Sequence, residues 1–139
     1  MYEDMDVMSK RERKAREDVI RVTIDEKKAN LAEKFGLYRE AAKTLVSYEK
    51  KLIAAEKALR KKATPRNTVR FDQYTAEMTV ACKNFKQAEE GVYEAIEIVH
   101  EDYIALEDLT EPETSKAKVR AEYAKFSDMM AKKIAAIEM

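Results

Sequence analysis

The stretch FDQYTAEMTVACKNFKQAEEGVYEAIEIVHEDYIALEDL, residues 71–109, carries apolar side chains at alternating spacings of three and four residues. This alternation is typical of an α-helix that packs along another helix in a coiled coil. One set of seam positions holds Phe71, Met78, Phe85, Val92, Val99 and Leu106, and the other holds Tyr74, Ala81, Ala88, Ala95, Asp102 and Leu109. We therefore predict a helix over about residues 68–109.

The chain before this stretch has a seven-residue apolar repeat of its own. Its members are Ile24, Leu31, Tyr38, Leu45, Leu52 and Leu59. The repeat continues past Gly36, so we predict one long helix over about residues 9–63, although glycine inside a helix costs about 1 kcal/mol relative to alanine. Pro65 ends the pattern because proline disfavours helical geometry at the residue before it.

A third apolar face follows the second proline, Pro112. Its members are Val119, Tyr123, Phe126, Met130, Ile134 and Ile137, which predict a helix over about residues 113–138. Thr110 and Glu113 have the spacing of a capping box for this helix. Asn67 or Thr68 is expected to cap the start of the helix before it.

Short connections between the three helices make sequential neighbours antiparallel. The sequence therefore predicts an all-α, elongated antiparallel three-helix coiled-coil bundle that forms a single domain over residues 1–139. We expect the seam to widen at Phe35, Ala42, Val46 and Ile53 in the first helix, and at Ile96, Tyr103 and Ile104 in the second. A slender bundle leaves apolar surface exposed, so we expect a homodimer that extends it into a longer helical bundle.

The composition favours a helical, cytoplasmic protein. The 139 residues include two Gly, two Pro and no Trp, and 39% of them are charged. No stretch is apolar enough to span a bilayer, and the N-terminal MYEDMDVMSKRERK is too charged for a secretory signal. Cys82 is the single cysteine, so the chain forms no internal disulfide.

Positive charge is concentrated at the turn around Pro65. Six basic side chains and no acidic one lie between residues 57 and 70, and we call these six the basic turn: Lys57, Arg60, Lys61, Lys62, Arg66 and Arg70. The whole chain has 27 Lys and Arg against 27 Asp and Glu, so this charge is local. A positive tip on a helical hairpin attracts an anionic surface, and the alternative is an ordinary solvated loop.

Negative charge is concentrated later in the chain. Residues 89–113 hold ten acidic side chains and no Lys or Arg. Five of them share helical spacing, and we call these five the acidic stripe: Glu90, Glu94, Glu97, Glu101 and Asp108. We expect them to form ion pairs with basic residues of the antiparallel first helix, such as Lys27, Lys28, Lys34, Arg39 and Lys43. The alternative is that they repel an anionic membrane, so that only the basic surface docks.

The sequence offers no catalytic constellation. Glu97 and His100 have the spacing that di-iron carboxylate bundles use, but the chain has one histidine, so a two-histidine site requires a dimer. Cys82 lies about five helical turns from His100, which is too far for a Cys–His pair within one chain. We therefore predict no catalytic residue, no metal site, no cofactor and no enzymatic activity.

The segment from Leu37 to Leu109 resembles the central part of a BAR domain, a crescent-shaped dimeric membrane-curvature module. The similarity lies in YEKKLIAAEKALRKKATPRNTVRFDQ and YTAEMTVACKNFKQAEEGVYEAIEIVHEDYIAL. In that family a long helix ends in a Lys/Arg-rich turn that contains proline, and the next helix returns to the dimer centre. The resemblance implies that Arg60, Lys61, Lys62, Arg66 and Arg70 touch lipid head groups.

These observations predict a non-enzymatic scaffold that dimerises and binds anionic phospholipid membrane peripherally through the basic turn. The alternative is a coiled-coil adaptor that binds another coiled-coil protein, or a self-assembling structural subunit. In a self-assembling subunit, the basic turn of one copy meets the acidic run of the next. Nucleic acid is a disfavoured partner, because the basic cluster is small and no aromatic side chain is interleaved before Phe71.

Overall fold

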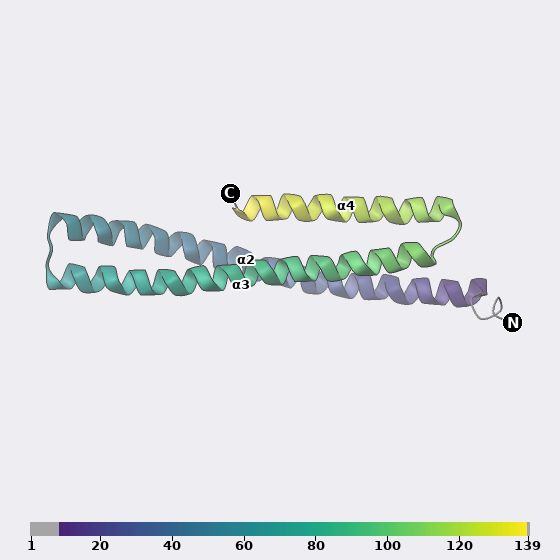
Figure 1. Ribbon diagram of the computed structural model, residues 1–139, viewed down its shortest axis with the longest axis horizontal. Helices are drawn as coiled ribbons and strands as arrows, with labels where there is room; N and C mark the ends of the chain where they lie inside the picture. The colour runs from purple at the N-terminus through teal and green to yellow at the C-terminus, as the bar shows by residue number, and fades with distance from the viewer. Residues whose placement is uncertain (1–8, 139) are drawn as a thin grey trace. The chain divides into compact units, whose positions relative to one another are not determined.

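The computed structural model describes residues 9–138, and these residues form three helices and no strand. The helices are α2 (Lys10–Lys61), α3 (Pro65–Leu109) and α4 (Glu113–Glu138), shown in Figure 1. The predicted all-α class is confirmed, and so is the prediction that the first helix continues past Gly36.

The start of α3 differs from the prediction. The Thr64 hydroxyl accepts a hydrogen bond from the Asn67 backbone N–H at 3.1 Å, so Thr64 is the N-cap. The prediction that Asn67 or Thr68 caps this helix is therefore wrong. Pro65 becomes the first helical residue, where its missing N–H has no intrahelical partner to lose and its fixed φ suits the helix.

α3 ends at Leu109, as predicted, but the capping box predicted for Thr110 and Glu113 does not form. The Thr110 hydroxyl and the Thr110 N–H both donate to the Leu106 carbonyl, at 2.6 and 3.0 Å. Thr110 is buried and continues the hydrogen bonding of α3, so it does not form a capping box with Glu113. At the start of α4 the Pro112 carbonyl instead accepts the N–H groups of Ser115 and Lys116.

The helices pack in two compact units. We call residues 9–32 and 94–137 the three-helix unit, and residues 33–93 the hairpin unit. In the three-helix unit, the first part of α2, the last part of α3 and α4 pack together with successive helices antiparallel (Figure 1). The hairpin unit consists of the rest of α2 and α3, joined by the turn at residues 62–64.

The three-helix unit has an enclosed core. It is formed by Ile24, Leu31, Ala95, Val99, Tyr103, Leu106, Val119, Phe126 and Met130, all of which are buried. The apolar face predicted for α4 thus packs inward. Tyr103 lies 5.9 Å from Phe126 between ring centroids, and the Lys28 ammonium lies 5.1 Å from the centre of the Tyr103 ring. These contacts join all three helices.

The hairpin unit has a narrower core because it contains only two helices. Phe35 and Tyr38 are fully buried in it, whereas Leu45 and Leu52 of the predicted seam are only half-buried. The predicted widening of the seam is wrong at Val46 and Ile53, which are 48% and 50% exposed. A pair of helices buries only the side chains at which the helices face each other. Val46 and Ile53 lie to one side of the contact between α2 and α3, so they stay exposed. The predicted widening is also wrong at Ile104 of α3, in the three-helix unit, because this side chain is 47% exposed.

Tyr38 places one polar group at the edge of this narrow core. Its ring lies 5.2 Å from that of Phe85, and its hydroxyl donates to the Glu89 carboxylate at 3.1 Å. Burial raises the pKa of the Tyr38 phenol well above its ordinary value, and the nearby Glu89 carboxylate raises it further. The phenol therefore keeps its proton and remains a hydrogen-bond donor at neutral pH.

Gly36 provides a simple test of the continuous helix. A Cβ added there meets no atom within 4 Å, and no glycine of the described residues has a positive φ. We therefore expect Gly36→Ala to raise the free energy of unfolding by about 1 kcal/mol, because alanine loses less backbone entropy in a helix. Urea denaturation followed by circular dichroism measures this change. A lower stability of the variant would contradict an unstrained helix at this position.

Candidate functional site

The basic turn is built on a junction that hydrogen bonds hold in place. The Asn67 side-chain amide donates to the carbonyls of Lys62 and Ala58, at 2.9 and 3.4 Å. The Thr64 N–H donates to the Lys62 carbonyl at 2.9 Å. Asn67 therefore ties the first turn of α3 to the end of α2 through the carbonyls of Ala58 and Lys62, which also accept the backbone N–H groups of Lys62 and Thr64. The basic side chains project from a fixed backbone.

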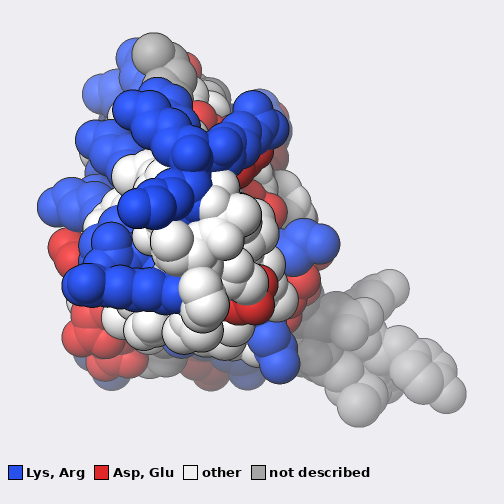
Figure 2. Space-filling view, turned by 90° about the vertical axis from the view of Figure 1, so that its left-hand side faces the viewer, with Lys and Arg blue, Asp and Glu red and all other residues white. Residues whose placement is uncertain are grey.

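All six basic side chains of the turn are exposed. Arg60 forms an ion pair with Glu56 at 2.6 Å, on the same helix. The other five, Lys57, Lys61, Lys62, Arg66 and Arg70, form no ion pair within residues 9–138. Figure 2, which views the molecule from the side of the α2–α3 turn, shows Lys and Arg gathered around a patch of uncharged side chains.

The helix dipoles explain the positions of some of these cations but not of all. Arg60 and Lys61 lie in the last turn of α2, where the partial negative charge of the helix end stabilises a cation. Arg66 lies in the first turn of α3, which has no acidic residue. A cation is disfavoured at that end of a helix. The position of Arg66 therefore does not follow from helix stability.

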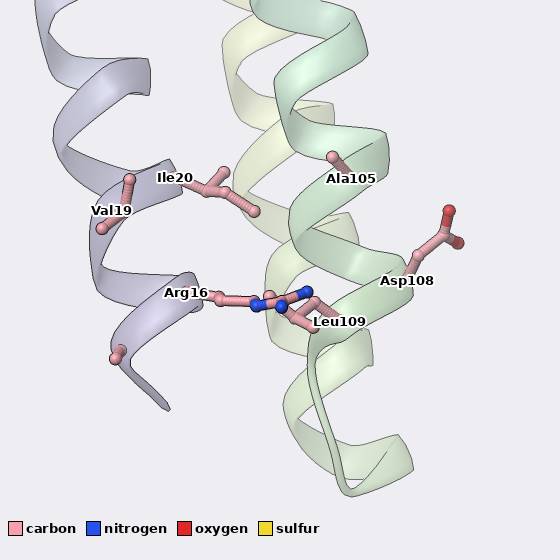
Figure 3. Close-up of a pocket in the computed structure, with 7 residues that line it drawn as sticks. Arg16, Val19, Ile20, Ala105, Asp108 and Leu109 are labelled. Carbon is pink, nitrogen blue, oxygen red and sulfur yellow. The ribbon is translucent and has the colours of Figure 1, made fainter. Parts of the chain in front are cut away.

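A groove in the three-helix unit is a second candidate surface, which the sequence analysis missed. It has a volume of about 630 Å³ and lies between α2 and α3 (Figure 3). Its lining residues are Ala15, Arg16, Val19, Ile20, Ala105, Asp108 and Leu109. Val19 is 65% exposed although it is apolar. The signal in the sequence is the pair Val19 and Val22, which lies outside the seven-residue repeat of this helix.

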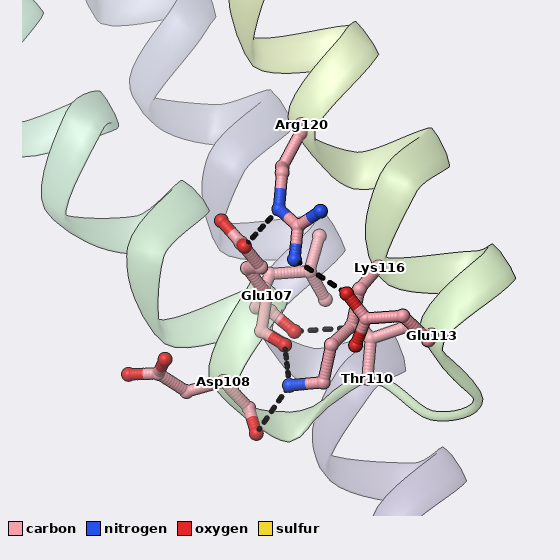
Figure 4. Close-up of polar contacts among 7 residues, drawn as sticks. Glu107, Asp108, Thr110, Glu113, Lys116 and Arg120 are labelled. Carbon is pink, nitrogen blue, oxygen red and sulfur yellow. Dashed lines mark hydrogen bonds and ion pairs between the residues drawn. The ribbon is translucent and has the colours of Figure 1, made fainter.

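The ten acidic side chains of residues 89–113 are only partly neutralised by ion pairs. Lys27, which was expected to pair with the acidic stripe, instead pairs with Asp102 of the predicted seam at 2.7 Å. On α4, the Arg120 guanidinium binds the carboxylates of Glu107 and Glu113, at 2.5 and 2.8 Å (Figure 4). The hydrogen bond from Arg120 lowers the pKa of Glu113, and the same bond raises the pKa of Arg120.

Lys116 completes this cluster at the end of α3. Its ammonium donates to the backbone carbonyls of Glu107 and Asp108, at 2.8 and 3.4 Å (Figure 4). These carbonyls belong to the last turn of the helix and have no intrahelical partner, so the cation from α4 satisfies them. The polar contacts of this cluster hold the turn between α3 and α4, which makes their role structural.

The acidic stripe does not pair as predicted. None of its five carboxylates forms an ion pair with another described residue. Lys28 instead lies over the Tyr103 and Phe126 rings, and Lys43 pairs with Glu40 on its own helix at 3.6 Å. The stripe members are exposed and lie on the face of α3 opposite its buried seam, so the basic side chains of α2 do not reach them.

The chain matches no protein-family model, and comparisons with curated proteins and with solved structures gave no match. The basic turn and the groove must therefore be interpreted from their own charges and contacts.

His100 and Cys82, the other residues considered from the sequence, do not form a reactive site with each other. His100 pairs through Nδ1 with the hydroxyl of Tyr123, and their ring centroids lie 4.8 Å apart. In residues 9–138, no group of three or more His, Cys, Asp or Glu is placed to hold a metal ion. No helix in this range is both long and apolar enough to cross a membrane. Cys82 is exposed on α3.

Proposed function

We propose that this chain is a non-enzymatic, BAR-like scaffold that forms a homodimer and binds anionic phospholipid membrane peripherally, at its cytoplasmic surface, through the basic turn. The observation that carries this proposal is the set of five exposed cations at the hydrogen-bonded turn that form no ion pair with any residue from 9 to 138. Arg66 supports it most directly, because a cation at that helix end is electrostatically unfavourable unless an anion compensates.

The mechanism is electrostatic attraction between the basic turn and lipid phosphates. Each basic side chain near an anionic membrane contributes about 1 kcal/mol, so the five unpaired residues contribute roughly 5 kcal/mol. One turn therefore binds weakly, and a dimer that presents two turns to one membrane binds more tightly through its higher effective concentration. Salt weakens the attraction because it screens exposed charges beyond a distance of about 10 Å at 0.1 M.

Vesicle co-sedimentation at low and high salt tests the proposal. The first variant carries Lys61→Glu, Lys62→Glu, Arg66→Glu and Arg70→Glu, and the matched control carries Lys83→Glu, Lys86→Glu, Lys118→Glu and Lys125→Glu. Both sets are exposed and without ion pairs within residues 9–138, and both change the net charge equally. We expect the first to weaken binding to anionic vesicles by roughly a thousandfold, since about 4 kcal/mol of attraction is lost.

The control variant is expected to keep most of its binding to anionic vesicles. The native chain is expected not to bind neutral vesicles. If the native chain pellets with neither kind of vesicle, membrane binding is ruled out. If both variants lose binding to the same extent, net charge and not the basic turn is responsible. Circular dichroism of each variant establishes that the helices are intact.

The unpaired acidic stripe favours a second candidate function, that of a self-assembling structural subunit. The exposed carboxylates of the stripe form no ion pair in the described part of the chain, and they complement the cations of the basic turn that likewise form none there. A contact between the stripe of one copy and the turn of the next is heterologous, and such contacts propagate into filaments when they do not close. Electron microscopy at low salt without lipid tests this candidate, and filaments that the first variant fails to form would support it.

A further inference from the structure

The groove between α2 and α3 of the three-helix unit combines apolar surface with two opposite charges. Val19, Ile20 and Leu109 line it, together with the small side chains of Ala15 and Ala105 (Figure 3). The apolar surface continues along the same helices, where Val22 and Ile98 are exposed. Ile98 precedes Ala105 by seven residues and therefore shares its face of α3. A surface of this kind is typical of an interface.

The two charged residues of the groove lie on opposite helices and are both unpaired. Arg16 belongs to α2 and Asp108 to α3, and both side chains are exposed. Neither side chain forms an ion pair within residues 9–138, although the Asp108 backbone carbonyl accepts a bond from Lys116. In Figure 3 the Arg16 side chain extends from α2 across the groove toward Leu109, and the Asp108 carboxylate points away from the groove on the outer side of α3. Both charges are therefore accessible to a second copy, with the positive one carried by α2 and the negative one by α3.

We propose that the groove is the homodimer interface, in which Arg16 of each copy pairs with Asp108 of the other. The proposal rests on the homodimer of the proposed function and specifies where that dimer forms. Because the groove is flanked by both helices, the same patch serves both copies, as an isologous interface requires. The apolar side chains are buried at the centre, and the two ion pairs lie at the rims.

The charges also select one of two possible symmetries. A two-fold axis parallel to the helices stacks each α2 on the partner's α3, at the level where Arg16 and Asp108 line the same groove. An axis perpendicular to the helices within the interface stacks α2 on α2 and brings like charges together, which is unfavourable. The first arrangement places the two three-helix units side by side, in contrast to the lengthwise extension expected from the sequence.

Charge reversal tests this arrangement in solution without lipid. We expect Arg16→Asp and Asp108→Arg each to raise the dimer dissociation constant at least tenfold, because each creates two like-charge pairs across the interface. An equimolar mixture of the two variants restores opposite charges at both sites. Analytical ultracentrifugation should therefore show a heterodimer with a dissociation constant within about threefold of the native value. Val19→Asp should also weaken the dimer, without unfolding the chain, because Val19 is exposed.

Arg11→Asp is the matched control, since Arg11 is exposed on the same helix and does not line the groove. It should leave dimerisation unchanged. A native chain that is monomeric at high micromolar concentration overturns the proposal, as do single variants that dimerise normally or a mixture that remains monomeric. Vesicle binding is measured in a separate experiment. A chain that stays monomeric but pellets with anionic vesicles would overturn the groove interface and leave the proposal of membrane binding in place.

Discussion

Replacing Leu106 with alanine is expected to lower the free energy of unfolding by about 2–5 kcal/mol, a large share of the stability of a small domain. Leu106 is fully buried in the three-helix unit. Its removal costs the transfer free energy of the lost methyl groups and leaves a cavity that the surrounding helices fill only in part. Urea denaturation followed by circular dichroism at 222 nm gives the change in stability.

Ile104→Ala is the matched control for Leu106→Ala. Ile104 lies two residues earlier on α3, has a similar volume and is 47% exposed. Its truncation is expected to cost less than about 1 kcal/mol, because most of the removed surface already faces water. Equal losses for the two variants would mean that the packing of α3 against α2 and α4 differs from that described.

The second large effect is expected at Phe35, in the hairpin unit. Phe35 is fully buried, and Phe35→Ala is expected to destabilise the protein by about 3–5 kcal/mol. The control is Ile53→Ala. Ile53 lies 18 residues further along α2, which is five helical turns, so both side chains project from the same face of the helix. Half of Ile53 is exposed, so its truncation should cost about 1 kcal/mol or less.

This comparison separates helix periodicity from burial. The sequence pattern treats Phe35 and Ile53 as equivalent members of one widened seam, and only the packing distinguishes them. Hydrogen exchange on both variants reports which unit is destabilised. A cost for Ile53→Ala as large as that for Phe35→Ala would show that this face of α2 is covered along its whole length, for example by a second copy.

The basic turn was located correctly from the sequence, because a run of like charges beside a helix-breaking proline is a local feature. The sequence did not reveal which of its basic side chains form ion pairs. Pairing depends on distances in space, and only the structure shows that Arg60 is held by Glu56 while Arg66 has no ion pair among the described residues. The groove was missed because its two rims come from residues about 90 positions apart in the chain.

The sequence by itself determined the three helices, their approximate ends and the buried seam at Tyr38, Val92 and Leu106. These follow from two rules that act within one helix: the period of 3.6 residues and the effect of proline. The tertiary structure decided that Val46, Ile53 and Ile104 stay exposed and that the acidic stripe has no ion pair within the described residues. An apolar or charged face is buried or paired only where another helix covers it, and the pattern of one helix holds no information about its neighbours.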